Sequence, residues 1–212
     1  MNLAIVVNTT DKYSYIWDAW YHYYKKYWTL ELPVYFLNET LDITYPFKQI
    51  KINIPEVELW TKKLRESIEQ IPEDNLFILL EDLLFTDGFY PGEFESIYQY
   101  FLNADADALR IQPKSKYTTT ISTMFSNVVK LTQDSEYLIA HTPNIWKKEF
   151  LLKCIKHDED PWTNEIIGTK RIQNKGFNIY HYRKEWFVNM LRHGRVVPKY
   201  KNLLQYNSLK IC

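Results

Sequence analysis

The sequence predicts an α/β fold in which a central mixed, mostly parallel β-sheet is flanked by helices and carries a small antiparallel portion. In the first 112 residues, short apolar runs bounded by turn residues alternate with helical patterns, an order that favours a layered parallel sheet. A Thr-rich pair of segments in the second half has the pattern of a hairpin, which adds the antiparallel portion. A chain of 212 residues suits a single domain.

The first elements follow from apolar spacing. Residues 3–7 predict a buried strand, and residues 33–37 and 50–54 predict a second and a short third strand. Residues 57–71 have the pattern of a helix that Pro72 ends. A helix between the first two strands packs one aromatic face on the sheet, because its large rings recur at three- and four-residue spacing: Trp17, Trp20, Tyr24, Tyr27 and Trp28.

Within the stretch 75–85, a short apolar run that ends at Leu80 predicts a strand buried on both faces, and Glu81 and Asp82 follow it directly. In open α/β sheets, ligands bind outside the carboxyl ends of the strands. Two acids at this point are therefore placed to hold a divalent cation or a ribose. The alternative is a strand that simply ends where it reaches water.

The second half continues the pattern with more elements. Arg110 lies near the end of one predicted strand and His141 at the end of another. In chain order the predicted elements are a helix over 91–103, a strand over 108–111, a hairpin of 117–123 and 128–131 joined through Ser126 and Asn127, a strand over 137–141, a helix over 146–155 and a last strand over 178–182.

Composition narrows the function classes. Lys plus Arg and Asp plus Glu number 26 each, so there is no overall field to attract nucleic acid. Aromatic residues make up 17% of the chain, which suits a core and also sites that stack sugars or bases. Cys154 and Cys212 lack metal-ligand spacing, and the start has neither a signal peptide nor an apolar run of membrane-spanning length, which together predict a cytoplasmic protein.

Several motifs are missing from the sequence. With five glycines, the chain contains neither a G-x-G-x-x-G fingerprint nor a G-x-x-x-x-G-K-[ST] loop, so hydride transfer and NTP hydrolysis are disfavoured. It also lacks a G-x-S-x-G elbow and an H-E-x-x-H helix, which weakens hydrolase interpretations.

Four segments together resemble a nucleotide-sugar glycosyltransferase of the GT-A fold: the turn 9–11 after the first strand, the helix 60–65, the strand end 79–82 and the block 159–165. The resemblance covers nearly the whole chain. It is strongest to small bacterial and viral glycosyltransferases, among them the N-terminal glycosyltransferase domain of a large chlorovirus protein, in which case the compartment is the host cytoplasm.

The resemblance implies a division of labour along the chain. Residues from about 1 to 112 form a nucleotide-binding half and residues from about 113 to 212 an acceptor and catalytic half. A UDP-sugar donor, a glycan acceptor, including one on a glycoprotein, and Mn²⁺ or Mg²⁺ are implied. Leu83 stands where the usual acid-x-acid pattern has its second acid, which leaves Asp82 as the metal ligand.

The nucleotide and donor sugar are expected to contact residues from both halves. Thr9 and Asp11 are expected to bind a uracil edge, with Tyr13 or Trp60 in aromatic contact and Arg65 holding Asp11 or the base end; a surface ion pair is the alternative for Arg65. The complete set of candidate donor-binding residues is Thr9, Asp11, Tyr13, Trp60, Arg65, Leu80, Glu81, Arg110, His141 and Trp162.

The acid block offers candidates for a general base in a single displacement with inversion. Pro161 fixes the backbone and Trp162 provides an apolar wall for a sugar ring, so a desolvated Asp160 with a raised pKa is the first candidate and Glu159 the second. Glu165 is expected to orient the acceptor or cap a helix. The alternative is that these acids are a solvated helix start.

The end of the chain is basic and is either a solvated tail or a flap whose cations cover a pyrophosphate. Its cationic residues are Arg183, Lys184, Arg192, His193, Arg195, Lys199, Lys201 and Lys210. Two other function classes stay open: a catalytically silent nucleotide-sugar or glycan-binding domain, and, ranked last, a metal-dependent nuclease or phosphotransferase.

Overall fold

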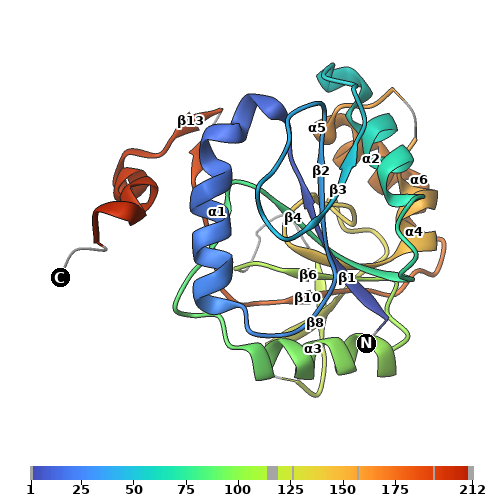
Figure 1. Cartoon of the computed structure of the whole chain (residues 1–212). Coiled ribbons are helices and arrows are strands. Elements are labelled where there is room, and N and C mark those ends of the chain that lie inside the picture. The colour runs from blue at the N-terminus through green and yellow to red at the C-terminus, as the bar shows by residue number, and fades with distance from the viewer. Residues whose placement is uncertain (1, 114–118, 126, 157, 193, 210–212) are drawn as a thin grey trace.

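A computed structural model of the chain describes residues 2–113, 119–125, 127–156, 158–192 and 194–209 (Figure 1). Its main sheet has the strand order β3-β2-β1-β4-β9-β6-β10-β8-β7. The strands are β1 (Leu3–Asn8), β2 (Val34–Asn38), β3 (Lys48–Lys51), β4 (Asn75–Leu80), β6 (Ala108–Ile111), β7 (Thr120–Ser122), β8 (Val128–Leu131), β9 (Asn144–Lys147) and β10 (Ile179–Tyr182).

The pairings confirm a mixed, mostly parallel sheet. Strands β3, β2, β1 and β4 are parallel, as are β6 and β10. Strand β9 is antiparallel to both β4 and β6, and β8 is antiparallel to β10 and β7. All of these strands except β9 and β8 therefore run in one direction, so most of their carboxyl ends meet at one edge.

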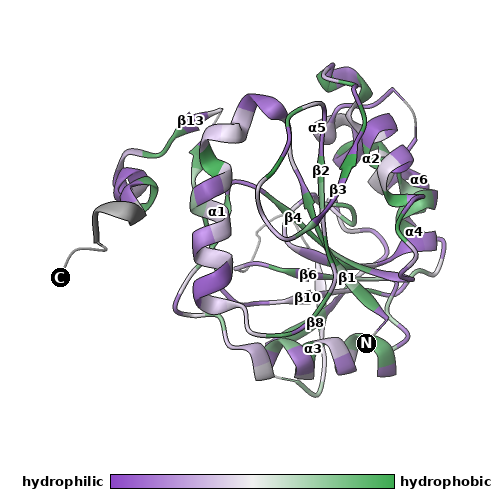
Figure 2. Ribbon diagram, in the orientation of Figure 1, coloured by the Kyte–Doolittle hydropathy of each residue, from purple (hydrophilic) through white to green (hydrophobic). Residues whose placement is uncertain are grey.

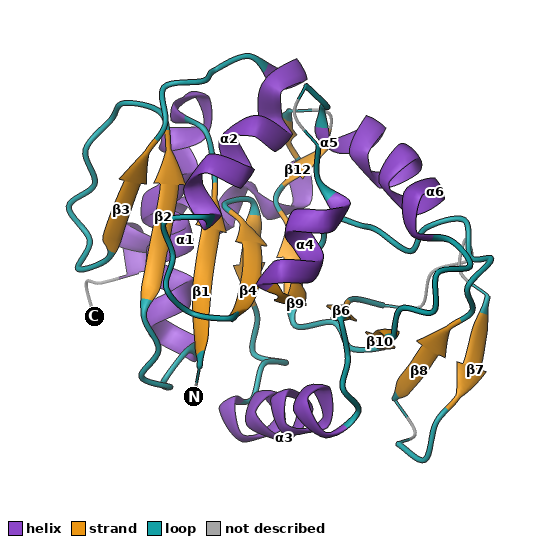
Figure 3. Ribbon diagram, turned by 90° about the vertical axis from the view of Figure 1, so that its right-hand side faces the viewer, coloured by secondary structure: helices purple, strands orange, loops and turns teal. Residues whose placement is uncertain are grey.

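Helices cover both faces of the sheet (Figures 1 and 3). One apolar cluster joins alternate residues of β1 to α1 (Ser14–Tyr27) and α3 (Pro91–Asn103). The other residues of β1 belong to a second cluster with α2 (Trp60–Ile68), α4 (Lys148–Cys154) and α6 (Thr169–Ile172). Figure 2 shows hydrophobic residues along β1 between these layers, whereas much of α1 is hydrophilic. The period of two in the strand decides which core each side chain enters.

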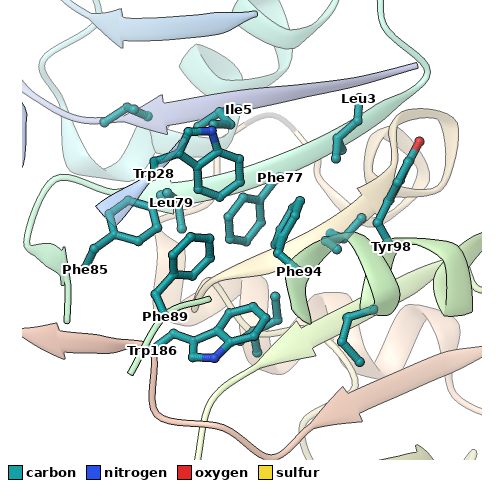
Figure 4. Close-up of a cluster of buried hydrophobic side chains, with 14 of the residues drawn as sticks. Leu3, Ile5, Trp28, Phe77, Leu79, Phe85, Phe89, Phe94, Tyr98 and Trp186 are labelled. Atoms are coloured by element: carbon teal, nitrogen blue, oxygen red, sulfur yellow. The ribbon is translucent and has the colours of Figure 1, made fainter. Parts of the chain in front are cut away.

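Aromatic rings tie a late segment of the chain to the end of β4 (Figure 4). Trp28 stacks on Phe89 with 5.1 Å between ring centroids, and Phe89 meets Trp186 edge-on at 5.2 Å. Strand β11 (Phe187–Asn189) then pairs antiparallel with β5 (Leu83–Phe85), the strand directly after the two acids. This packing holds residues 190–192 over the strand end.

The remaining elements are short. They are the 3-10 helices η1 (Asp11–Tyr13), η2 (Val57–Leu59) and η4 (Pro198–Leu209), the helix α5 (Pro161–Thr163), the π-helix η3 (Asn164–Gly168) and the strands β12 (Leu191–Arg192) and β13 (Arg195–Val196). None of the helices in the described ranges has the length and apolarity that crossing a membrane requires.

One predicted element was wrong, and one predicted helix begins two residues later than expected. Residues 137–141 do not form a strand, because side chains satisfy their backbone: Thr169 Oγ1 accepts from the amides of Leu138 and Ile139, and Arg110 donates to the carbonyls of Tyr137 and Leu138. The strand here is β9, so the helix predicted from residue 146 begins at Lys148.

Smaller differences concern element boundaries. The third strand spans 48–51 rather than 50–54, and β10 is followed by three short strands rather than being the last. The predicted hairpin exists as β7 and β8, although residues 117, 118 and 126 lie outside the described ranges.

Candidate functional site

A cleft of about 470 Å³ lies at the carboxyl ends of β1 and β4. Its walls come from the turn after β1, the end of β4, the loop before β9, the start of α5 and η3, and the late residues Leu191, Arg192 and Gly194. His141 reaches this edge because β9 is antiparallel: Asn144, the first residue of β9, pairs with Ile78 near the end of β4. Among the sequence-predicted residues, Thr9, Tyr13, Trp60, Leu80, Glu81, Asp82, His141, Trp162 and Glu165 line the cleft.

Of the two acids at the end of β4, Glu81 is buried and Asp82 is partly buried. Burial raises the pKa of Asp82 to about 6, and burial together with the neighbouring Asp82 raises the pKa of Glu81 to about 8. Oδ1 of Asp82 is buried without a hydrogen-bond partner in the described part of the chain. A buried carboxylate oxygen in this condition is stabilised by a proton or by a cation.

These acids fit a divalent cation that is shared with a ligand. In the described ranges, no group of three His, Cys, Asp or Glu side chains is placed to hold a metal. The position after Asp82 is Leu83, which is buried in β5. Mg²⁺ is often bound by one or two carboxylates with phosphate oxygens and waters completing its shell, and the pair Glu81 and Asp82 matches that smaller donor set.

Asp11 anchors the loop after β2. Its carboxylate accepts hydrogen bonds from the side chain of Asn38 (2.8 Å), from the amide and hydroxyl of Thr40 (2.8 and 2.6 Å) and from the amide of Leu41 (3.1 Å). Burial opposes ionisation, but these bonds outweigh it and lower the pKa of Asp11 to about 2. The acceptor atoms expected to meet a base are therefore already engaged with the loop.

A second hollow, also of about 470 Å³, adjoins the cleft. The two share the lining residues Thr10, Tyr13, Val57 and Trp60. Beneath the second hollow lies a buried ion pair between Lys63 and Glu39, whose side chains are 2% and 5% exposed. Lys63 also donates to the carbonyl of Thr9 at 2.9 Å. The sequence prediction missed this pair, although a lysine between Trp60 and Leu64, on the buried side of the helix, was a signal for it.

The two predicted arginines lie behind the cleft and are not among its lining residues. Arg65 does not hold Asp11: it donates to the carbonyls of Leu152 and, at 2.8 Å, Ile155, and forms the alternative ion pair with Glu69 at 3.2 Å. Arg110 is 1% exposed and bonds to the carbonyl of Tyr137 at 3.0 Å. A guanidinium has several N–H donors, and both arginines use them on backbone carbonyls.

The acid block divides into capping, pairing and cleft-lining residues. Asp160 is the N-cap of α5, since it accepts from the amide and hydroxyl of Thr163 at 2.9 and 2.6 Å. These hydrogen bonds lower its pKa, so the expected raised pKa was wrong. Glu159 forms a bidentate pair with Arg171 at 2.5 and 2.8 Å, which lowers its pKa against the effect of burial. Neither acid is among the lining residues of the cleft.

Glu165 is the acid of this block that lines the cleft. Burial raises its pKa, although a hydrogen bond from the amide of His141 (2.7 Å) and the charge of Arg110 act in the opposite direction. Trp162 lies near it on the cleft wall with 68% of its surface exposed. A partly desolvated carboxylate beside an exposed indole is suited to accept a proton from a sugar hydroxyl.

Of the basic residues near the end of the chain, Arg192 lines the cleft. It also lines a neighbouring hollow of about 430 Å³ with Lys184 and Lys199. Lys184 is paired with Glu93 at 3.1 Å, and Arg183 donates to the hydroxyl of Thr120 at 3.1 Å. His193 and Lys210 lie outside the described residues.

Comparisons with known proteins address the fold. No protein-family model and no curated protein matches the chain. Similar solved structures include S. aureus TarS 1–349 in complex with UDP (TM-score 0.62, 14% identity, 88% of this chain and 59% of that chain). Two others are the same protein with UDP-GlcNAc (0.59, 14%, 88% and 57%) and UTP-bound UGPase from Acinetobacter baumannii (0.60, 8%, 98% and 93%).

The chain thus spans less than two thirds of the TarS structures and nearly all of the UGPase structure. At these identities the likeness concerns the fold. The chain therefore shares the α/β fold of these structures, with a mixed, mostly parallel sheet between helices.

Proposed function

We propose that the chain is a glycosyltransferase that moves a sugar from a UDP-sugar to a hydroxyl of a glycan acceptor. The observation that carries the proposal is the composition of one cleft. At the end of β4 it contains two adjacent acids with raised pKa values that are suited to a cation, and on the wall formed by η3 it contains Glu165, a carboxylate with a raised pKa. A Lewis acid beside the leaving group and a base beside the nucleophile are the two elements of this transfer.

The residues of the cleft support one orientation of the donor. The base lies against Tyr13 and Trp60, where the two hollows meet. The diphosphate lies between the acids of β4 and Arg192, whose guanidinium suits phosphate oxygens. The sugar then occupies the part of the cleft lined by His141 and Trp162. The similar structures that hold UDP and UDP-GlcNAc support a ligand of this class.

Asp82, with Glu81 beside it, would hold Mn²⁺ or Mg²⁺. Such an ion offsets the negative charge that develops on the departing diphosphate. The high pKa of Glu81 supports a division of roles in which Asp82 is the ligand and Glu81, which the hydroxyl of Thr9 reaches, positions it or binds the ribose.

Glu165 takes the first place among the proposed catalytic acids, ahead of Asp160 and Glu159, because it alone of the three lines the cleft in the described structure. In the proposed inverting displacement, the acceptor oxygen forms a bond to the anomeric carbon as the bond from that carbon to the phosphate oxygen breaks. The hydroxyl proton passes to Glu165, and UDP leaves. The hollow that shares Arg192 with the cleft would receive the acceptor.

The test is release of UDP from UDP-sugars in the presence of Mn²⁺ and of oligosaccharide acceptors, together with thermal stabilisation by nucleotides, since a ligand that binds the native state raises its stability. UDP-sugar binding without any transfer would favour the silent binding domain. Stabilisation by GDP and ADP equal to that by UDP would contradict the uracil assignment.

A nucleotidyltransferase is the second candidate, because the chain and the UTP-bound UGPase cover 98% and 93% of each other. The first turn, Asn8 to Lys12, contains no glycine to let a backbone approach a triphosphate, which favours the glycosyltransferase. Pyrophosphate release from UTP and a sugar 1-phosphate would reverse the ranking. The resemblance to a chlorovirus domain and a cytoplasmic location stay predictions.

A further inference from the structure

A series of hydrogen bonds runs from the protein interior to the cleft through Asn164, which is fully buried in η3. Its Nδ2 donates to Glu159 Oε2 at 2.7 Å and to the carbonyl of Cys154 at 3.2 Å. Glu159 is in turn held by both terminal nitrogens of Arg171. Since a carbonyl oxygen and an ionised carboxylate accept hydrogen bonds and cannot donate them, both amide hydrogens of Asn164 point inward.

This orientation of Asn164 determines the tautomer of His141. The oxygen Oδ1 of Asn164 lies 2.8 Å from Nε2 of His141 and must act as the acceptor in that contact. Nε2 of His141 therefore carries hydrogen. A neutral imidazole has one N–H, so Nδ1 is left as an acceptor with a free lone pair.

His141 is kept neutral by its surroundings. Burial, with the charge of Arg110 acting in the same direction, lowers its pKa to about 4 even though the bond to Asn164 favours the charged form. The facing charged groups are Arg110, Glu159 and Glu165, the last of which accepts from the main-chain amide of His141 rather than from the ring. The ring is thus an uncharged acceptor throughout the neutral pH range.

Nδ1 is the ring nitrogen of His141 that no described group bonds. His141 lines the cleft, and its ring contacts Trp60 edge-on with centroids 4.4 Å apart. Within the described residues, Asn164 is the side chain that bonds the ring, and Nδ1 is not among the enclosed polar atoms that lack a partner. Nδ1 and the Glu165 carboxylate consequently form a wall of hydrogen-bond acceptors.

We propose that Nδ1 of His141 accepts a hydrogen bond from a hydroxyl of the donor sugar, and that the series Arg171, Glu159 and Asn164 sets the tautomer required for it. The inference rests on the proposed function. The class of ligand follows from chemistry, because sugar hydroxyls donate hydrogen bonds whereas a diphosphate presents only acceptor oxygens to such a wall. This also explains why Glu159 is paired in the interior: it acts through His141 as a positioning residue.

Two substitutions distinguish the roles of the two ring nitrogens of His141. In His141→Gln, the terminal amide nitrogen takes the place of Nε2 and keeps the donor to Asn164, while the acceptor at Nδ1 is lost. In His141→Asn, the shorter amide takes the place of Nδ1 and loses the contact with Asn164. A purely structural histidine would therefore tolerate Gln better than Asn in every measurement.

The experiment compares thermal stability and the affinities for UDP and for UDP-GlcNAc, both with Mn²⁺ and without acceptor. For His141→Gln we expect wild-type stability, wild-type UDP affinity and about tenfold weaker UDP-GlcNAc binding relative to UDP, the loss typical of one hydrogen bond. For His141→Asn we expect lower stability. Unchanged relative affinity in His141→Gln would overturn the proposal. The sugar of another donor would also donate a hydrogen bond from a hydroxyl to Nδ1. The comparison of UDP with UDP-sugar affinity is therefore repeated with UDP-glucose and UDP-galactose.

Imidazole nitrogen NMR provides a readout that a structural role would not move. The ring should show the Nε2–H tautomer from pH 6 to pH 8, and the Nδ1 signal should shift on adding the UDP-sugar but not on adding UDP. A protonated Nδ1 would contradict the inference whatever the ligand. If the wild-type protein binds no UDP-sugar, the proposed function fails as well, whereas binding with an unresponsive Nδ1 refutes the inference alone.

Discussion

The main-chain amide of His141 donates a hydrogen bond of 2.7 Å to Oε1 of Glu165. The two residues come from the loop before β9 and from the π-helix η3, and the bond fixes the carboxylate on the wall of the cleft. π-Helical turns occur frequently at functional sites, and this one places Glu165 in a buried environment that raises its pKa.

Replacing Glu165 by Gln should lower the transfer rate about 10²- to 10⁴-fold, the range for loss of a general base, with UDP affinity nearly unchanged. Asp160→Asn is the matched control, because Asp160 caps α5 and should affect stability rather than rate. Steady-state transfer rates and UDP titrations of both variants provide the measurement. A large rate loss in Asp160→Asn with a near wild-type Glu165→Gln would return the base assignment to Asp160.

Asp82→Ala should remove the dependence of donor binding on Mn²⁺ while leaving the fold intact. Asp82 is partly buried, with a raised pKa and an unpartnered Oδ1, so its loss breaks no described side-chain hydrogen bond. UDP-sugar affinity with and without Mn²⁺, together with thermal unfolding, would establish this. An Asp82→Ala protein that still binds the donor more tightly when Mn²⁺ is added would exclude the metal role.

The acid pair should make the metal-free protein less stable as pH rises. Glu81 has a folded pKa of about 8 against 4.5 as its ordinary value, so the native state binds more protons, and the stabilising effect of the proton is lost from about pH 4.5 up to about pH 8. His141 and His181, whose pKa values are lowered to about 4, act oppositely below pH 6.5. The informative quantity is therefore the difference in the free energy of unfolding between the wild type and Glu81→Gln.

Chemical denaturation at pH 5 and pH 8 should show the wild type losing stability relative to Glu81→Gln over this interval. Mn²⁺ should reduce that loss, since the cation takes the place of the proton. If the difference in the free energy of unfolding between the wild type and Glu81→Gln is the same at both pH values, Glu81 is ionised in the folded protein.

Lys63→Met should destabilise the fold by about 3–5 kcal/mol, because it leaves the carboxylate of Glu39 buried without its partner. Lys51→Met is the matched control, since Lys51 pairs with Asp42, which is 89% exposed, and such pairs contribute at most about 1 kcal/mol. Urea unfolding midpoints of the two variants should differ accordingly. Equal effects would show that the Lys63 pair is solvated in solution.

Asp11→Asn should lower the stability of the loop after β2 by about 1–3 kcal/mol. The substitution replaces one carboxylate oxygen by an NH₂ group, which cannot accept the hydrogen bonds that Thr40 and Leu41 donate to Asp11. Asp42→Asn, in the same loop but exposed, is the control. If Asp11 instead forms a hydrogen bond with the uracil, the UDP affinity of Asp11→Asn will fall while its melting temperature stays at the wild-type value.

Much of the fold follows from local patterns. The helix over residues 91–103 has the predicted bounds, because Pro91 is suited to the first helical position and its apolar spacing is regular. The strand end before Glu81 and Asp82 was also predictable. A wholly apolar strand must lie between two layers of helices, and the first charged residues show where the chain leaves them.

The sequence by itself determined which residues form β4, and that two acids follow it at the ligand-binding edge. Tertiary structure decided which later acid faces them. Asp160 and Glu159 are adjacent in the chain, yet one caps a helix and the other pairs with Arg171, while Glu165 enters the cleft. These outcomes depend on partners that folding brings together, such as Asn164 with His141 and Thr169 with the backbone at Leu138. Spacing along a chain determines the face of a helix or strand, but the partner of a polar group depends on what packs against that face.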